Sequence, residues 1–257
     1  MQRGAILALF AHPDDESFAV GGTLARYAAE GIPISIITAT RGERSTLGES
    51  GRFSTEALGR LRTRELKRAA AVLGVKEVRI LGYPDGGLSE LPAGKLESDI
   101  AAAIEEIRPS AVLTFDVGGV TGHPDHIAMA AAATMAFGSA AKAGGAIASP
   151  RHARLFYWVL PDSLAASIEA ATGTRWVSTP DDAVGVIVDT SAFLEVQRRA
   201  IACHRSQSNP LPEALVARLA TQRGREFFVL AESTIGMEQL SGNDLFAEPV
   251  TSQQQRP

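Results

Sequence analysis

The apolar run Ala5-Ile6-Leu7-Ala8-Leu9-Phe10 passes directly into Ala11-His12-Pro13-Asp14-Asp15-Glu16, and Gly21-Gly22 follows shortly afterwards. The first half is typical of a buried strand, whereas the second half places an imidazole, a turn-forming proline and two adjacent carboxylates where the chain must bend. In open α/β sheets, ligands bind beyond the carboxyl ends of the strands. This stretch therefore predicts a buried strand over 6–10 and a polar site directly after it, in a loop that extends to Gly22.

Strands and helices are expected to alternate over the first half of the chain. The strands expected after the first are 34–39, 78–81 and 111–115, and the expected helices are 23–30, 55–73, 94–107 and 125–141. Beyond Ala143 the alternation is looser, with strands expected over 155–160, 184–188 and 226–230 and helices over 191–205 and 211–222. Repeated strand–helix units predict an α/β fold with right-handed crossovers. We expect a Rossmann-like, doubly wound, mostly parallel sheet with helices on both faces and extra C-terminal strands and helices.

The composition is that of an ordinary globular domain. Apolar residues make up 45% of the 257 residues and charged residues 21%, so residues 1–243 are expected to form a single domain and 244–257 a polar, mobile tail. The net charge of −4 offers no basic surface for a nucleic acid. No run reaches the roughly 18 apolar residues of a membrane helix, and Cys203, the single cysteine, excludes an internal disulfide. We therefore expect a soluble, cytoplasmic protein without a nucleic-acid or membrane partner.

A second polar stretch, Gly122-His123-Pro124-Asp125-His126, follows the expected strand 111–115 in the same way. Proline is favoured in the first position of a helix, which places His123 near a helix start and His126 in the first turn. We expect the two polar stretches to meet above the sheet, where two histidines and one carboxylate with an open fourth position would suit a catalytic divalent metal. The natural ligands are His12, Asp15 and His126. Each stretch alone would also fit an ordinary turn with a structural histidine.

Taken together, His12-Pro13-Asp14-Asp15-Glu16 and His123-Pro124-Asp125-His126 resemble the paired motifs of the LmbE-like, or PIG-L, family of zinc-dependent N-deacetylases. The resemblance extends from Ile6 to about Gln207. It implies zinc-dependent hydrolysis of the N-acetyl amide of an N-acetylglucosamine-containing small molecule, with release of acetate and a free amine. Members of the family deacetylate N-acetylglucosaminyl-inositol and N-acetylglucosaminyl-malate, or cleave conjugates of mycothiol.

The family pattern also implies a role for the residues of both motifs. Zinc would be bound by His12, Asp15 and His126. Asp14 would be the general base that takes a proton from the attacking water. His123 would stabilise the oxyanion or protonate the leaving amine, and Asp125 would orient and charge His123.

Three residues outside the motifs are candidates for substrate binding. Glu43 follows the second expected strand at the same sheet edge as His12, and is either an acceptor for a sugar hydroxyl or a solvated loop carboxylate. Arg62 shares the inward stripe of the second expected helix with Glu65, so the two either form a buried ion pair or reach a polar cavity. The family resemblance matches Arg62 to an arginine near the substrate. His204 also faces inward, and fits either a satisfied core histidine or a substrate contact.

Other functions are compatible with these residues. Within the hydrolases, the chain could be an amidase that acts on a larger thiol conjugate. Two histidines and one carboxylate also form the site of Fe(II) oxygenases, although the spacing from His12 to Asp15 differs from the usual one. A non-catalytic sugar-binding module is the third alternative, and retention of Asp14 beside a full ligand set argues against it.

The run Gly118-Gly119-Val120-Thr121-Gly122-His123 departs from the family pattern. Family members that act on the inositol substrate resemble Gly-Gly-Tyr-Gly-His here, and the missing tyrosine argues against an inositol-type substrate. The sequence leaves open the aglycone, the choice between zinc and iron(II), and whether the chain forms a homo-oligomer.

Overall fold

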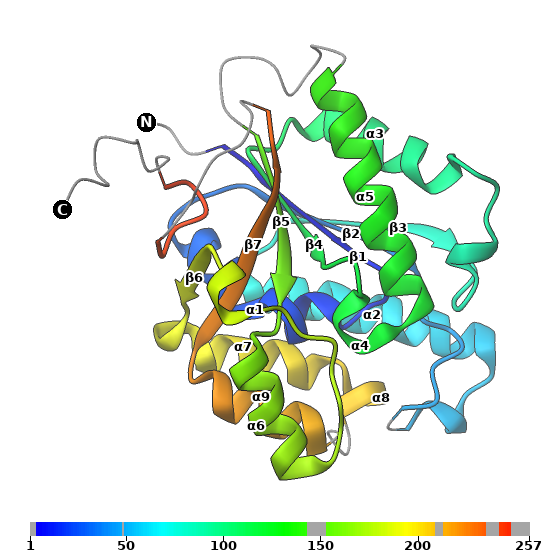
Figure 1. The fold of residues 1–257 in the computed structure, drawn as a ribbon. Coiled ribbons are helices and arrows are strands. Elements are labelled where there is room, and N and C mark those ends of the chain that lie inside the picture. Colours follow the sequence, from blue (N-terminus) through cyan, green and yellow to red (C-terminus); the bar gives the residue numbers. More distant parts are fainter. Residues whose placement is uncertain (1–3, 48, 143–152, 209–212, 235–241, 248–257) are drawn as a thin grey trace, which may run out of the picture.

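The computed structural model describes residues 4–47, 49–142, 153–208, 213–234 and 242–247. In that part of the chain, one seven-stranded sheet has the order β3-β2-β1-β4-β5-β7-β6 (Figure 1). The strands are β1 (Ile6–Phe10), β2 (Ile34–Thr40), β3 (Glu77–Tyr83), β4 (Ala111–Phe115), β5 (Arg154–Val159), β6 (Val186–Asp189) and β7 (Arg225–Ser233). The strands β3, β2, β1, β4 and β5 are parallel, whereas β7 runs antiparallel to both β5 and β6. The predicted α/β fold with a mostly parallel sheet is confirmed.

Helices alternate with strands as far as β5 and gather more densely after it. They are α1 (Asp15–Ala29), α2 (Thr55–Leu73), α3 (Lys95–Ile107), α4 (Gly119–Gly122), α5 (Pro124–Lys142), α6 (Asp162–Thr172), α7 (Leu194–Cys203), α8 (Arg205–Ser208) and α9 (Glu213–Gln222). Helix α3 packs against α5, and α5 packs against β1 and β4. Helices α1, α2 and α7 pack together as a second group, which lies apart from α3 and α5 in Figure 1.

Strand β1 lies where the strand order reverses. The chain winds from β1 through β2 to β3 on one side, and from β4 to β5 on the other. The strands β1, β2 and β4 are buried along their whole length, as expected of strands covered on both faces. A crevice forms beyond the carboxyl ends of the strands at such a reversal. The residues after Phe10 and those after Phe115 therefore lie at the same edge.

Helix α1 differs from its prediction. It begins at Asp15 instead of residue 23, and Val20 interrupts it with φ −130° and ψ 20°. Gly21 and Gly22, which predict a loop from the sequence, lie inside this helix. A Cβ on Gly22 would lie only 2.5 Å from Cβ of Thr190, so glycine permits the side chain of Thr190 to approach the backbone of α1 closely here.

Charged side chains from the C-terminal part of the chain form hydrogen bonds with backbone groups of α1 on both sides of the interruption. Arg218 of α9 donates to the carbonyl of Phe18 before the break. Glu226 of β7 accepts the N–H groups of Gly22 and Thr23 after it, at 2.9 and 2.8 Å. The positive charge of Arg218 lies at the carboxyl end of the segment before the break, and the negative charge of Glu226 lies at the amino end of the segment after it. Both arrangements are favourable for the helix dipole. Burial lowers the pKa of Arg218 to about 10 and raises the pKa of Glu226 to about 7, because both groups have lost their hydration.

Elements β1, α2 and β4 have the predicted bounds, and the other predicted elements are present with shifted ends. Helix α6 is an additional helix that no strong sequence signal marks. The predicted helix over 191–205 is a 3₁₀ turn (Ser191–Phe193) followed by α7 and α8, with a break at His204. Of the tail predicted from residue 244, residues 244–247 pack on the core. Leu245 is fully buried and donates its N–H to the hydroxyl of Tyr27 at 2.8 Å. This packing corrects the predicted boundary, and residues 248–257 lie outside the described residues.

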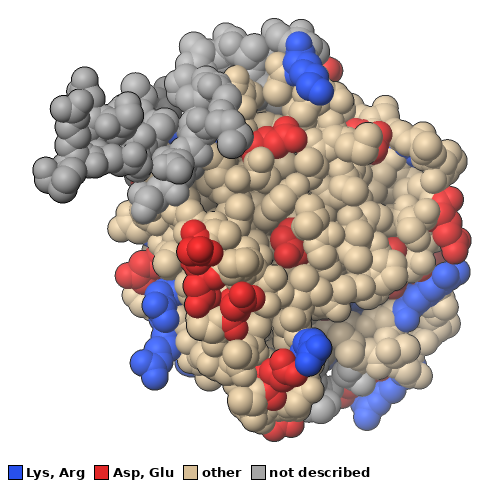
Figure 2. Space-filling view, viewed as in Figure 1, with Lys and Arg blue, Asp and Glu red and all other residues tan. Residues whose placement is uncertain are grey.

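The surface carries both signs of charge. Figure 2 shows lysine and arginine side chains mostly near the margin of the face that is drawn, and acidic and uncharged side chains over much of the rest. None of the helices in the described ranges combines the length and the apolar character that crossing a membrane requires.

Candidate active site

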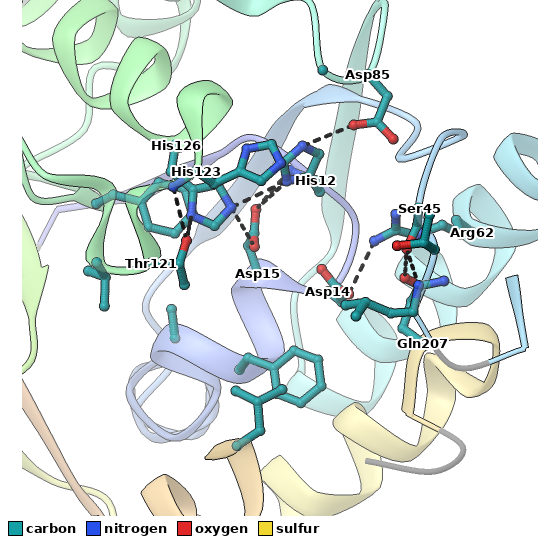
Figure 3. Close-up of a pocket in the computed structure, with 18 of the residues that line it drawn as sticks. His12, Asp14, Asp15, Ser45, Arg62, Asp85, Thr121, His123, His126 and Gln207 are labelled. Carbon is teal, nitrogen blue, oxygen red and sulfur yellow. Dashed lines mark hydrogen bonds and ion pairs between the residues drawn. The ribbon is translucent and has the colours of Figure 1, made fainter. Parts of the chain in front are cut away.

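A cavity of about 480 Å³ opens beyond the carboxyl ends of β1 and β4 (Figure 3). Its wall includes His12, Asp14, Asp15, His123 and His126, so the two polar stretches of the sequence lie together. In Figure 3 the labelled histidines gather around Asp15 on one side, while Asp14 lies toward Arg62 on the other. One side of the cavity, the ligand side, thus carries the histidines and Asp15. The other side, the base side, carries the carboxylate of Asp14 next to the guanidinium of Arg62.

The three predicted metal ligands point toward one another. Nδ1 of His12 lies 3.3 Å from Nε2 of His126, and this Nε2 lies 3.4 Å from Oδ1 of Asp15. Nδ1 of His12 and Oδ2 of Asp15 are 3.6 Å apart. A tetrahedral zinc with bonds of about 2.0–2.1 Å holds its ligand atoms roughly 3.3–3.4 Å from one another. The two distances from Nε2 of His126 match this spacing, whereas His12 faces the other carboxylate oxygen of Asp15 at a slightly longer distance.

Neighbouring groups of opposite charge stabilise the charged forms of His12 and Asp15. Burial alone would lower the pKa of His12, but hydrogen bonds to Asp125, Asp15 and Asp85 raise the pKa well above its ordinary value. Burial would raise the pKa of Asp15, yet the charges and hydrogen bonds of His126 and His12 bring it far below its ordinary value. A divalent cation would take the place of the protons that these groups share.

Two carboxylates hold the outer nitrogen of His12. Nε2 of His12 lies 3.1 Å from Oδ1 of Asp85 and 3.2 Å from Oδ2 of Asp125. Asp85 accepts the backbone N–H of Arg44 at 2.7 Å, and Asp125 accepts two backbone N–H groups of the loop after β3 at 2.8 and 3.1 Å. These contacts place a proton on Nε2 of His12 and leave Nδ1 to face a metal.

The geometry gives Asp125 a contact with His12 that was not expected. Its carboxylate contacts His12, and no described hydrogen bond joins it to the ring of His123. Nδ1 of His123 instead accepts the backbone N–H of Asp125 at 3.1 Å. The reason is that Asp125 lies fully buried in the first turn of α5, where its side chain meets the backbone donors after β3. Asp85, which follows β3, shares this contact with His12.

His126 is oriented from the opposite side. Its Nδ1 lies 3.1 Å from the carbonyl oxygen of Gly119 and 3.2 Å from the hydroxyl of Thr121. Its ring stacks on Phe115, with 4.0 Å between the ring centres and 5° between the planes. The proton of the neutral ring is therefore placed on Nδ1, and Nε2 is aimed at Asp15 and His12.

In the described residues, two sets of three side chains bring one ligand atom from each residue within 4.8 Å of the others, and neither set includes Asp15. They are His12 with His123 and His126, and His12 with Asp85 and Asp125. The first set adds His123 beside the same metal position. In the second set, Asp85 and Asp125 already accept backbone N–H groups. These carboxylates are therefore better placed to orient His12 than to bind a second metal.

Asp14 lies beside the ligands in a different environment. It is 7% exposed, and its Oδ2 lies 3.1 Å from Nη2 of Arg62. Burial raises the pKa of Asp14 to about 6; the charge of Arg62 opposes this rise and that of Asp15 adds to it. A carboxylate with such a pKa can accept and release protons near neutral pH, as a general base must.

His123 lies at the exposed edge of the cavity. Its ring centre is 4.8 Å from that of His12 and 5.1 Å from that of His126. Burial and the charges of these two rings lower the pKa of His123, so the ring is neutral near pH 7. Because Nδ1 accepts the N–H of Asp125, the neutral ring carries its proton on Nε2 and can donate it.

Arg62 is the one predicted substrate-binding residue that lines the cavity. It is 3% exposed and donates to the carbonyl oxygens of Gly42, at 2.7 Å, and of Pro13. Arg62 is not paired with Glu65, whose carboxylate accepts the N–H and the hydroxyl of Ser206 at 3.0 and 2.6 Å. The predicted alternative of an ion pair between Arg62 and Glu65 is therefore wrong.

The expected substrate contacts of Glu43 and His204 are corrected, because neither side chain lines the cavity. Glu43 accepts the backbone N–H of Asp85 at 3.2 Å and so supports the loop that holds His12. His204 is fully buried, and its Nε2 lies 2.8 Å from Oε1 of Glu16. Helical periodicity indicates correctly that His204 faces inward, but it does not indicate that its partner is Glu16.

Further parts of the cavity wall have no marked signal in the sequence. Ser45 donates to Oε1 of Gln207 at 2.5 Å, which joins the loop after β2 to α8. The apolar wall includes Phe18, Trp158, Trp176 and Leu215. These residues come from distant segments, so only the folded chain brings them together.

Comparisons with known proteins give consistent results. The family model described as "PIG-L: GlcNAc-PI de-N-acetylase" matches residues 7–137. The 1D-myo-inositol 2-acetamido-2-deoxy-alpha-D-glucopyranoside deacetylase of Thermobifida fusca is 34% identical over 237 residues, which cover 79% of this chain and 82% of that protein. A conserved protein from Thermus thermophilus has a solved structure with a TM-score of 0.66 and 28% identity, covering 88% of this chain and 94% of that chain. The N,N'-diacetylchitobiose deacetylase of Pyrococcus horikoshii shares the fold, with a TM-score of 0.65 and 21% identity over 87% of this chain and 82% of that chain.

Proposed function

The chain belongs to the PIG-L family, and from this premise we propose that it is a metal-dependent deacetylase that hydrolyses the N-acetyl amide of an N-acetylglucosamine-containing small molecule. The observation that carries the proposal is the cluster of His12, Asp15 and His126 beside Asp14 in one cavity. The products would be acetate and a free amine. A cytoplasmic location is part of the same proposal.

His12, Asp15 and His126 would hold the metal. Zinc is our first choice because two imidazoles and one carboxylate with an open position form a common catalytic zinc set, and iron(II) accepts the same ligands. Bound there, the cation would lower the pKa of a water to about 7 and polarise the amide carbonyl.

Asp14 would act as the general base. With a pKa of about 6 its carboxylate is mostly ionised at neutral pH, and it can take a proton from the attacking water. The same group can then return the proton to the departing amine. Arg62 keeps the carboxylate in place at 3.1 Å, and its charge counteracts the effect of burial on the pKa.

His123 would stabilise the oxyanion as a neutral donor. Its Nδ1 is occupied by the N–H of Asp125, so Nε2 is the nitrogen that carries a proton. A neutral imidazole suits this role because it can donate a hydrogen bond to developing negative charge without a change in protonation. Removing one such donor typically lowers the rate by about 100- to 1,000-fold.

The substrate class follows from the relatives rather than from a bound ligand. The relative from Thermobifida fusca is named as the deacetylase of an inositol 2-acetamido-2-deoxyglucoside, which supports a 2-acetamido sugar as the reacting part here. The run from Gly118 to His123 lacks the tyrosine of the Gly-Gly-Tyr-Gly-His motif that inositol-specific members of the family resemble, so the aglycone need not be inositol. A cavity of about 480 Å³ is within the usual range for a small-molecule site.

The test measures acetate release by the purified chain after removal and return of metal. N-acetylglucosaminides of inositol, malate and an aromatic aglycone are offered to the metal-free, zinc-loaded and iron(II)-loaded chain. We expect acetate only from the loaded chain, and neither metal nor acetate release with His126→Ala. Equal rates with and without metal would contradict the proposal. Sugar binding without hydrolysis would favour a binding module, and turnover that depends on 2-oxoglutarate would favour an oxygenase.

A further inference from the structure

Asp14 has a backbone conformation that residues other than glycine rarely adopt. Its φ is 121° and its ψ is −27°, a region in which the side chain of an L-residue is strained. Such conformations persist only where the surrounding structure holds them, and they cluster at active sites. The contacts that hold this turn therefore bear on the work of Asp14 as a base.

The side chains of Glu16 and Arg62 both bind the turn at Asp14. Oε2 of Glu16 accepts the backbone N–H of Asp14 at 3.0 Å, and the carbonyl of Asp14 accepts the N–H groups of Ser17 and Phe18 in α1 at 3.0 Å. Arg62 binds the other side, through the carbonyl of Pro13 and the carboxylate of Asp14. Of these two side chains, only Arg62 lines the cavity.

The second oxygen of Glu16 is bound on the side away from the cavity. Oε1 accepts the hydroxyl of Ser17 at 2.6 Å and lies 2.8 Å from Nε2 of His204. Glu16 and His204 are both 0% exposed. Burial alone would lower the pKa of His204, but the charge and hydrogen bond of Glu16 raise it. The ring of His204 also stands at the carboxyl end of α7, which favours a cation.

We propose that the ion pair of Glu16 and His204 is a positioning device for the base: it fixes the carboxylate of Glu16 beneath the N–H of Asp14, and so keeps the carboxylate of Asp14 turned into the cavity. The proposal rests on the proposed function, since it takes Asp14 as the base. It assigns a task to two residues that lie outside the cavity wall and whose described side-chain contacts include none of the three predicted metal ligands.

A pair that served stability alone would tie α1 to α7 without any effect on the chemistry. Glu226 provides a matched control for that case. It is also a buried carboxylate that accepts backbone N–H groups of α1, but it does so at Gly22 and Thr23, beyond the interruption at Val20. Its removal should weaken the fold without moving Asp14.

The test compares Glu16→Ala and Glu16→Gln with Glu226→Ala in the metal-loaded chain, by kcat, KM, bound metal and the midpoint of thermal unfolding. We expect Glu16→Ala to lower kcat by about 100-fold, the effect of displacing a catalytic group by about 1 Å, with KM and bound metal unchanged. Glu16→Gln keeps an oxygen for the N–H of Asp14, so its kcat should stay within about threefold. Glu226→Ala should lower the unfolding midpoint and leave kcat within about threefold.

A second pair of variants approaches the ion pair from its other member. His204→Ala leaves the carboxylate of Glu16 buried without its cation, whereas His204→Gln can still donate to it. We expect His204→Ala to lower kcat by roughly tenfold and His204→Gln to restore most of the loss. This pair decides the question if Glu16→Ala does not fold.

Crystal structures of the unchanged chain and of Glu16→Ala give a readout that does not depend on activity. The φ of Asp14 should return to a negative value in the variant. An unchanged φ, an unchanged kcat, metal lost in step with activity, or an equal loss of kcat in Glu226→Ala would each overturn the positioning role. Failure of the unchanged chain to release acetate from any substrate would overturn the proposed function alone, because the φ of Asp14 would still test the positioning.

Discussion

The ligand side and the base side of the cavity share one turn after β1, yet they are supported in different ways. On the ligand side, His12, Asp15 and His126 all avoid positive φ. The outer nitrogen of each histidine there has two polar neighbours within 3.2 Å. On the base side, Asp14 has a φ of 121°, and single side chains from α1 and α2 hold it.

The difference teaches where the site tolerates change. A histidine with two acceptors on its outer nitrogen keeps its orientation when one acceptor is lost, so damage to the ligand side should be graded. The strained turn of Asp14 has no second acceptor for its N–H in the described contacts, and in the proposed mechanism its carboxylate alone performs the proton transfer. Damage to the base side should therefore be steep, and the predictions below test this contrast.

The largest effect is expected for Asp14→Asn. Asparagine has nearly the same shape and adopts positive φ more readily than most residues, so the turn should persist. Its amide cannot take a proton, and kcat should fall by about 100- to 10,000-fold, the usual contribution of a general base. Steady-state acetate release and metal analysis measure the two properties separately. Bound metal should equal that of the unchanged chain. A loss of metal together with activity would contradict the separation of the ligand side from the base side.

The ligand side was largely predictable from the sequence because its information is local. His12 and Asp15 are three residues apart, and Pro124 fixes the helix start that presents His126. Strand patterns then place both segments at one edge of a parallel sheet. Local pattern and strand order together were enough to predict that the three proposed ligands lie in one cavity.

The base side was not predictable to the same degree, because its supports come from far along the chain. Periodicity indicates that Arg62 and His204 face inward, but the partner of His204 lies 188 residues away in Glu16. Gly21 and Gly22 suggest a loop from their type alone, although they serve close packing within α1. A positive φ at Asp14 has no signal in the sequence, since aspartate is not a residue that requires one.

A graded effect is expected for Asp125→Asn. The amide oxygen can still accept from Nε2 of His12, and Asp85 keeps its own contact at 3.1 Å. Loss of one charge from this support should weaken metal binding by about tenfold, at the lower end of the usual range for such groups. Competition with a chelator measures the metal affinity, and Asp85→Asn is the matched variant. Complete loss of metal from either variant would contradict the redundancy of the ligand side.

The pH dependence of the rate tests the base side without a substitution. Burial raises the pKa of Asp14 to about 6, and only the ionised carboxylate can act as a base. The rate should therefore be full above that pKa and fall as the pH drops through it, to about one-tenth at pH 5. The measurement is kcat/KM from pH 5 to 8 at saturating metal, with bound metal determined at each pH. A rate that stays constant down to pH 5 while the metal stays bound would exclude Asp14 as the titrating base.

The smallest effect is expected for Thr121→Val, which removes one of the two acceptors at Nδ1 of His126. The carbonyl of Gly119 remains at 3.1 Å, and the stacked ring of Phe115 still fixes the plane of the imidazole. Metal affinity should therefore fall by about threefold or less, below the usual effect of such supports. Chelator competition with Thr121→Val and Asp125→Asn side by side measures the contrast. A loss for Thr121→Val as large as that for Asp125→Asn would mean that the backbone carbonyl cannot orient His126 alone, and that the ligand side depends on single contacts as the base side does.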